Sequence, residues 1–219
     1  AFTSTRVMST CAAIGQAVGT AAAMCAENKI SPAKLRHTPA MLKSLQQTLL
    51  RNDQTIVGIK NEDPDDLARC AKISASEATD GSAAENIISG VNLDSPKSNK
   101  NRWVADAANK PWIRLDWASP KKVGQLRITF VSGWGALSQT GSYYLLTTMI
   151  RGAQPMLVKD YDIIGITENG SEKLLERVSD NYQKLRVHNF DKISLKGLKI
   201  AVNSTNGSNK AYIKEVRDY

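Results

Sequence analysis

The sequence predicts a mainly β protein, with an antiparallel β-sandwich over residues 73–219 and a short α-helical segment before it. Three observations carry this prediction. Short runs of alternating apolar residues follow residue 73, turn-forming residues separate them, and small or leucine-rich stripes at helical spacing precede them. Many short alternating strands with turns between them indicate a sandwich. About 147 residues is enough chain to bury a single core.

The first expected helix covers residues 11–26 and is dense in alanine and glycine. Gly15 and Gly19 are four residues apart and therefore share one helix face. Because glycine in a helix interior costs up to about 1 kcal/mol relative to alanine, we expect close packing to compensate for it. The alternative is a small-residue face that packs against another helix. Gln16 and Thr20 interrupt the apolar run, so we expect no membrane span.

A second helix is predicted to begin after Thr38, because threonine is a good N-cap and Pro39 suits the first helical position. An apolar stripe from Met41 to Leu49 follows at helical spacing, and the helix is expected to end near Asn52. The Ser31-Pro32 pair upstream is expected to break the chain between the two helices.

The expected organisation has three parts: a helical segment over residues 1–58, a linker over 59–72 and the sandwich over 73–219. The linker is acidic, contains a proline and is expected to hold one helical turn at Leu67–Cys70. Within the sandwich, strands are expected at residues 112–117, 126–130, 161–167, 174–178, 185–187, 198–202 and 212–216.

Charge and metal-ligand composition exclude several functions. The net charge is +8, with 9 Lys and Arg against 6 Asp and Glu in residues 1–72 and 20 against 15 in the rest. This excess is spread out, and no basic stripe with a reading element is visible, so we expect no nucleic-acid binding. His37 and His188 are the only histidines. A zinc site or a cysteine–histidine nucleophile pair is therefore not expected.

The helical part carries a resemblance. Residues 6–35, RVMSTCAAIGQAVGTAAAMCAENKISPAKL, and residues 45–54, LQQTLLRNDQ, resemble the C-terminal end of a family of FAD-dependent oxidoreductases. The last helix of the flavin domain in that family has the pattern TCAAxGQAxGTAAAL. The dinucleotide fingerprint GxGxxG does not occur in this sequence, so we expect the chain to be a C-terminal fragment that lacks the N-terminal flavin domain.

This resemblance implies a cofactor contact in the full-length parent only. The helix N-terminus would point at FAD, with the backbone N–H groups of Cys11, Ala12 and Ala13 facing a flavin carbonyl. Gly15 would allow the flavin or a neighbouring strand to come close. By itself the chain is not expected to hold FAD.

The second part resembles the galactose-binding-like jelly roll of the discoidin or coagulation-factor type C group, which includes many carbohydrate-binding modules. The motifs that carry this resemblance are ISASE at 73–77, AENIISG at 84–90, NRWVAD at 101–106, PWIRLDWASPKKVGQLRITF at 111–130, KDYDI at 159–163, NYQKLRVHNF at 181–190 and STNGSNKAYIKEVRDY at 204–219. They span nearly all of residues 73–219. The resemblance implies a jelly-roll sandwich that binds carbohydrate as an accessory module.

Aromatic residues on a loop are the first candidates for ligand binding. Trp134, Tyr143 and Tyr144 lie in the Gly- and Ser-rich stretch 131–154 and could stack on a sugar ring, or the loop could fold back and bury them. Trp103 and Trp112 begin or flank strands, so we expect them in the core.

Two polar residues complete the candidate ligand site. Arg186 and His188 lie where the jelly-roll resemblance is strong, and a histidine at a strand end could bind a ligand hydroxyl. A structural hydrogen bond is the alternative for His188.

Members of this jelly-roll group often hold a structural calcium, which the resemblance places near Ser89, Asn92, Asp94 and Glu215. Ser89 stands where the family pattern has an aspartate, so one carboxylate is missing, and Asn92 or Asp94 would have to substitute for it.

The expected function is a carbohydrate-binding accessory region of an FAD-dependent oxidoreductase. One alternative is a docking module that packs against the enzyme and binds no ligand. A second is a polysaccharide-active enzyme such as a lyase, although the sequence specifies no catalytic pair. Low cysteine content permits several compartments, and a periplasmic or extracellular location is favoured if the parent acts on polysaccharide.

Overall fold

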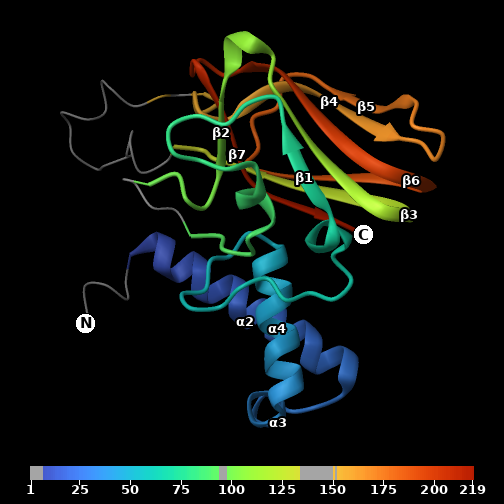
Figure 1. The fold of residues 1–219 in the computed structure, drawn as a ribbon. Helices are drawn as coiled ribbons and strands as arrows, with labels where there is room; N and C mark the ends of the chain where they lie inside the picture. Colours follow the sequence, from blue (N-terminus) through green and yellow to red (C-terminus); the bar gives the residue numbers. More distant parts are fainter. Residues whose placement is uncertain (1–6, 94–97, 134–149, 151) are drawn as a thin grey trace. The chain divides into compact units, whose positions relative to one another are not determined.

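The computed structural model describes residues 7–93, 98–133, 150 and 152–219, which fall into two compact units (Figure 1). The first, here the helical unit, comprises the described residues of 1–63 together with 91–93. The second, here the sandwich unit, comprises the described residues of 64–90 and 94–219.

The helical unit contains α2 (Met8–Asn28), α3 (Pro32–His37) and α4 (Pro39–Arg51). The prediction for α4 is confirmed, since Thr38 is its N-cap, Pro39 its first residue and Asn52 its C-cap. The expected break at Ser31-Pro32 is confirmed, since α2 ends at Asn28, but the short helix α3 was not expected; Ser31 caps it by accepting a hydrogen bond from the Lys34 N–H at 3.3 Å. The serine–proline pair thus begins a helix for the same reason as the threonine–proline pair does.

Helix α2 has few buried side chains. Among its described residues only Cys25 is buried, whereas Met8 is 87% exposed and Val18 is 62% exposed. By length and composition alone this 21-residue helix could cross a membrane, which the sequence analysis did not expect. Core helices of soluble proteins and signal sequences meet the same requirement, so length and composition do not decide what covers α2.

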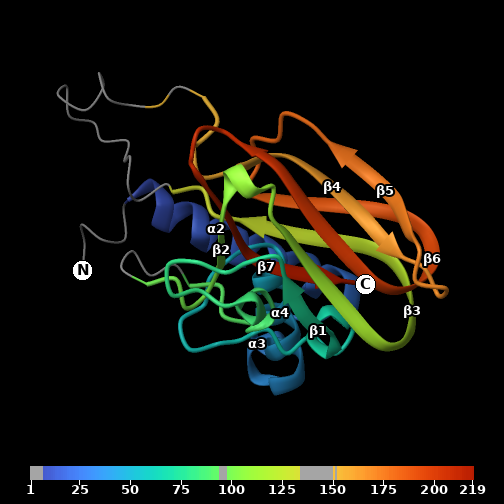
Figure 2. The same ribbon diagram turned by 45° about the horizontal axis from the view of Figure 1, so that its top comes forward.

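The sandwich unit is an antiparallel sheet of seven strands, which confirms the predicted mainly β, antiparallel class (Figures 1 and 2). The strands at 72–75 and 103–106 lie outside the ranges expected from the sequence. The strand order is β2-β7-β3-β6-β4-β5, and β1 pairs with β3. The strands are β1 (Lys72–Ala75), β2 (Trp103–Asp106), β3 (Trp112–Phe130), β4 (Val158–Ile166), β5 (Glu172–Val178), β6 (Leu185–Thr205) and β7 (Lys210–Asp218), with short 3₁₀ helices at Leu67–Cys70, Ala84–Ile88 and Ala107–Asn109.

Strands β3 and β6 are each longer than the sequence indicated. We expected two strands in each of these regions, but each is one strand that pairs with the other over most of its length. The register shifts between Asp116 and Lys121, which brackets Pro120, so the proline occurs where ladder hydrogen bonding is already interrupted. The expected strand ranges 112–117 and 126–130 leave this segment outside the strands.

Strand β6 contacts one aromatic side chain of β4 at two places that are distant along β6. Tyr161 of β4 pairs with Val202 near the end of β6, yet its ring also contacts His188 near the start of β6, with ring centroids 5.8 Å apart. Phe130, at the end of β3, packs edge-on against Tyr161 at 5.2 Å. The side chain of Tyr161 thus links the start of β6 and the end of β3 to the strand that pairs with the end of β6.

The core follows the predicted alternation. Ile113 and Leu115 are fully buried, whereas Arg114 and Asp116 between them are half-buried. Trp103 is fully buried as expected, and its indole N–H donates to the Glu77 carbonyl at 2.7 Å. Trp112 is only half-buried.

Candidate functional site

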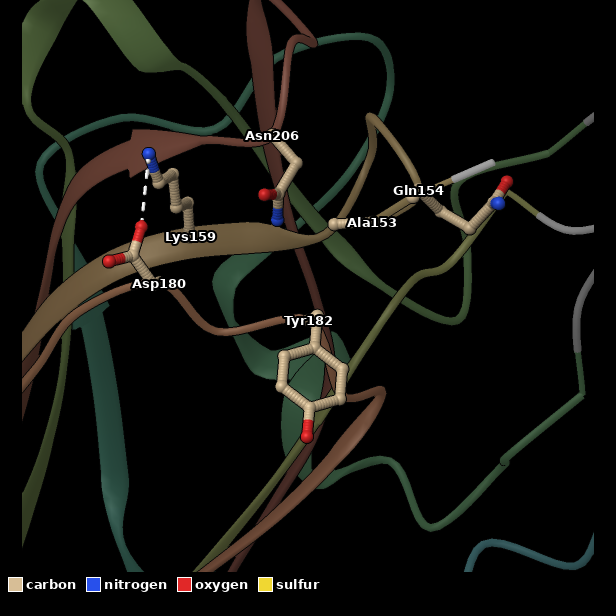
Figure 3. A pocket seen from close by; sticks show the side chains of 7 residues that line it. Ala153, Gln154, Lys159, Asp180, Tyr182 and Asn206 are labelled. Atoms are coloured by element: carbon tan, nitrogen blue, oxygen red, sulfur yellow. Dashed lines mark ion pairs between the residues drawn. The ribbon is translucent and has the colours of Figure 1, made fainter. Parts of the chain in front are cut away.

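The surface of the sandwich unit carries a cavity of about 680 Å³ (Figure 3). It is lined by Gly152, Ala153, Gln154, Lys159, Asp180, Tyr182 and Asn206. These residues come from the segment before β4, the start of β4, the β5–β6 connection and the β6–β7 connection. Pairing of Val158 with Thr205 brings the start of β4 next to the end of β6, so connections distant in sequence converge on this cavity.

Tyr182 is the exposed aromatic group of the cavity. Its side chain extends away from the β5–β6 connection in Figure 3, and the residue is 68% exposed. An aromatic ring in this position offers a flat apolar face together with a hydroxyl that can hydrogen-bond. The flat C–H face of a sugar ring is a suitable partner for such a surface.

Lys159 and Asp180 form an ion pair at 3.2 Å, with side chains 40% and 83% exposed. An exposed pair of this kind adds little stability. It does present a hydrogen-bond donor and an acceptor side by side, which suits ligands that carry neighbouring hydroxyl groups.

Two amides complete the polar lining. The Asn206 side-chain amide donates to the carbonyls of Leu157 at 3.2 Å and Asn181 at 2.9 Å, which fixes its orientation. The Gln154 side-chain oxygen is buried and has no hydrogen-bond partner among the described residues. In Figure 3 the Gln154 side chain that carries this buried oxygen extends away from Tyr182, Lys159 and Asn206.

The sequence analysis did not single out these residues. Lys159, Asp180, Tyr182 and Asn206 all lie next to or within motifs that carry the jelly-roll resemblance, but none of them is among the predicted ligand residues. The signal that could have found them is an aromatic residue in a turn-forming stretch, Ser-Asp-Asn-Tyr-Gln, where Asp180 has a positive φ of 54°.

The predicted aromatic ligand residues, Trp134, Tyr143 and Tyr144, lie outside the described residues. Arg186 is half-buried, and its guanidinium lies 3.5 Å from the side-chain oxygen of Asn181.

His188 is 2% exposed, and both ring nitrogens have partners inside the protein. Its Nε2 lies 3.0 Å from the Tyr161 hydroxyl and its Nδ1 lies 2.9 Å from the Glu176 carboxylate. Burial lowers the pKa of His188 more than the Glu176 carboxylate raises it, and burial also raises the pKa of the Tyr161 hydroxyl. His188 therefore makes structural hydrogen bonds, which was the alternative to a ligand contact in the sequence analysis.

The predicted calcium ligands are distributed over both units. Asp94 lies outside the described residues, Asn92 belongs to the helical unit, and Ser89 and Glu215 belong to the sandwich unit. The Glu215 carboxylate is buried and pairs with Arg217 at 3.0 Å. In the part of the chain that the structure describes, no group of three His, Cys, Asp or Glu side chains could hold a metal ion, and the calcium set stays a prediction.

The predicted FAD-facing residues Cys11, Ala12, Ala13 and Gly15 are all exposed on α2. The Cys11 N–H donates to the Val7 carbonyl at 3.0 Å, so it belongs to the helix ladder. Helix geometry leaves the preceding N–H groups, those of residues 8–10, without an intrahelical acceptor. Among the described residues no side chain caps this end, and the first turn contains no acidic residue.

Comparisons with known proteins match the helical segment and the sandwich to different proteins. Residues 1–49 match the family model described as FAD dependent oxidoreductase. A comparison with curated proteins found no match.

The sandwich is similar to several solved structures. One is chitosan-binding module 1 of a chitosanase/glucanase from Paenibacillus sp. IK-5, at 14% identity and a TM-score of 0.52 over 70% of this chain and 98% of that one. Another is the family 32 carbohydrate-binding module of EndoD from Streptococcus pneumoniae, at 17% identity and a TM-score of 0.52 over 70% and 98%. A fucose-binding module from Streptococcus pneumoniae is similar at 14% identity and a TM-score of 0.52 over 72% and 97%. The chain therefore joins a segment similar to FAD-dependent oxidoreductases to a galactose-binding-like jelly roll with the fold of family 32 carbohydrate-binding modules.

Proposed function

We propose that this chain is the C-terminal region of an FAD-dependent oxidoreductase and that its sandwich is an accessory module that binds carbohydrate at the Tyr182 cavity. The observation that carries the proposal is the combination of an exposed aromatic ring and an exposed donor–acceptor pair at one cavity. The domain limits 1–58, 59–72 and 73–219 belong to this proposal.

The neighbouring structures support the ligand class. Their titles describe chitosan-binding, fucose-binding and family 32 carbohydrate-binding modules. Each of the three is matched over almost its whole length, so the likeness concerns a complete module fold. The specific sugar would depend on the loops of this chain.

The match over residues 1–49 supports the flavin half of the proposal. In the parent enzyme, FAD would supply the redox chemistry. The residues of this chain would contribute the exposed small-residue face of Cys11, Ala12, Ala13 and Gly15 and the uncapped N-terminus of α2. Adding a Cβ at Gly15 would meet no described atom within 4 Å, so this face is open to a closely approaching group.

A docking module without a ligand is the second candidate, and the exposed apolar side chains of α2 favour it. A lyase-type enzyme has less support, because among the described lining residues only Asp180 carries a carboxylate, and it is paired with Lys159. If the parent acts on polysaccharide, a periplasmic or extracellular location is favoured. Calcium near Ser89 and Glu215 would be a structural addition only.

The test is a glycan array followed by calorimetric titration of the best binder. Tyr182→Ala should weaken binding roughly tenfold or more, since truncating an aromatic anchor removes most of its contact with the ligand. Leu174→Ala is the matched control, because Leu174 is 49% exposed on β5 and does not line the cavity. If the intact chain binds no glycan, or if both variants bind as the wild type does, the sandwich is not a carbohydrate module of this kind.

A further inference from the structure

The segment between β5 and β6, residues 179–184, carries both Asp180 and Tyr182, yet it is a connection outside the strands. A connection of this kind is mobile unless side chains or backbone groups fix it. The residue between the two cavity residues, Asn181, is 1% exposed. A buried asparagine flanked by two exposed cavity residues suggests that its role is to hold them.

The Asn181 side chain bonds on both sides of its amide. Its Nδ2 donates to the Val158 carbonyl of β4 at 2.8 Å and to the Gln183 carbonyl at 3.1 Å. Its Oδ1 accepts from the Gln183 N–H at 3.1 Å. The two contacts with Gln183 close a turn around Tyr182, and the contact with Val158 ties that turn to the sheet.

The Asn181 backbone adds two further ties. Its N–H donates to the Lys159 carbonyl at 2.9 Å, and its carbonyl accepts from the Asn206 side chain at 2.9 Å. Both partners line the cavity. Asn181 therefore connects the three chain segments that carry Lys159, Tyr182 and Asn206.

An independent contact fixes the preceding residue. The Asp180 N–H donates to the Asp160 carboxylate at 2.9 Å, and the Ser204 hydroxyl also donates to that carboxylate. These two hydrogen bonds lower the pKa of Asp160, with the Ser204 contribution the larger, so the carboxylate acceptor is charged at neutral pH. Asp160 lies on β4 and does not line the cavity.

We propose that Asn181 is a positioning residue that pre-organises Tyr182 and Asp180 for carbohydrate binding, an inference that rests on the function proposed above. Ordering a loop and its side chains on binding costs free energy, and a loop that is already ordered avoids this cost. Loss of Asn181 should therefore weaken the ligand complex although Asn181 itself touches no ligand.

The test compares Asn181→Ala with Asn86→Ala in the whole chain. Asn86 is a matched control, because its amide also donates to two backbone carbonyls, those of Asn99 at 3.1 Å and Arg102 at 3.0 Å, and it does not line the cavity. Asn181→Ala should weaken glycan binding by roughly three- to tenfold, and Asn86→Ala should leave affinity unchanged at a similar loss of thermal stability. Equal affinity for Asn181→Ala and wild type, or an equal loss in both variants, would overturn the inference.

A spectroscopic measurement keeps the inference separate from the proposed function. In protein labelled with fluorotyrosine, the fluorine resonance of Tyr182 can be assigned among the six tyrosines with Tyr182→Phe. Even if the wild type binds no glycan, Asn181→Ala should move this resonance toward the position of an unfolded peptide, whereas Asn86→Ala should not move it. An unmoved resonance in Asn181→Ala would contradict the inference.

If Asn181→Ala does not fold, Asp160→Ala removes the separate contact with the Asp180 N–H. This variant should shift the same resonance and weaken binding in the same direction. Unchanged binding and an unchanged resonance in Asp160→Ala would also count against a pre-organised connection.

Discussion

The two units of this chain differ in how completely they bury their apolar side chains. In the sandwich unit, Trp103, Ile113, Tyr161 and Ile200 belong to one cluster and are fully buried. In the helical unit, α2 buries only Cys25 among its described residues and exposes Met8, Ile14 and Val18 by more than half. The comparison indicates that the sandwich is stabilised by its own core, whereas α2 contributes little buried apolar surface among the described residues.

The largest expected effect is the loss of stability when a core residue of the sandwich is truncated. Truncation of an exposed apolar residue of α2 is the comparison. Trp103→Ala should lower the free energy of unfolding by about 3–5 kcal/mol, because it leaves a large cavity and an unbonded Glu77 carbonyl. Val18→Ala, on the exposed face of α2, should change it by no more than about 0.5 kcal/mol. Urea denaturation followed by tryptophan fluorescence measures both. Comparable losses would show that α2 is buried as deeply as the core.

A buried carboxyl group in the sandwich provides the second prediction. Asp218 is fully buried, neither carboxylate oxygen has a hydrogen-bond partner among the described residues, and burial and the neighbouring Asp66 charge raise its pKa to about 8. Between about pH 4 and pH 8, the folded state therefore holds a proton that the unfolded chain has lost, so stability should fall as pH rises through this range. Asp218→Asn should remove this slope and raise the free energy of unfolding at pH 8 by about 2–4 kcal/mol.

Two comparisons isolate the Asp218 effect. Burial lowers the pKa of His188, so His188 makes the folded protein less stable as the pH falls below the pKa of histidine in the unfolded chain. This effect is opposite to that of Asp218 and is the same in wild type and Asp218→Asn. Asp162→Asn is the control, because the Arg177 hydrogen bond lowers the pKa of Asp162. That variant should be less stable at neutral pH. Stabilisation by Asp162→Asn, or a retained slope in Asp218→Asn, would contradict this account.

The third prediction compares the change in stability when one glycine in each unit is replaced by alanine. A Cβ at Gly197 in β6 would lie 2.5 Å from the Leu115 carbonyl, so Gly197→Ala should destabilise the chain by about 1–3 kcal/mol. A Cβ at Gly19 in α2 would meet nothing within 4 Å among the described residues. Gly19→Ala should therefore stabilise the chain by about 0.5–1 kcal/mol. Thermal unfolding monitored by circular dichroism measures both signs, and destabilisation by Gly19→Ala would mean that a neighbour already occupies this face.

The smallest expected effect concerns the uncapped end of α2. Ser9→Glu adds a carboxylate near the helix N-terminus and should stabilise the helix by about 0.3–1 kcal/mol in this chain. In a full-length protein that places FAD at this end, the same carboxylate should instead lower the flavin content, which absorbance of the purified protein measures. Asn28→Glu, at the other end of α2, is the control for flavin content. Unchanged flavin in Ser9→Glu would place the cofactor elsewhere.

The sequence allowed the fold to be predicted where local patterns decide it. The alternation of apolar and polar residues predicted which residues of β3 are buried, and the capping residues predicted the ends of α4. It did not predict that β3 continues through Pro120 or that β6 is one strand, because those depend on pairing between residues far apart in sequence. For the same reason it missed the cavity, since the proximity of Lys159, Tyr182 and Asn206 follows from the register of β4 with β6 and from the contacts of Asn181.

The measurement that tests the central claim most directly is calorimetric titration of the intact chain with its best glycan ligand, compared with Tyr182→Ala and Leu174→Ala. The account predicts measurable binding by the wild type, a loss of roughly tenfold or more in Tyr182→Ala and no change in Leu174→Ala. Full affinity in Tyr182→Ala would contradict the claim that the Tyr182 cavity is the carbohydrate site.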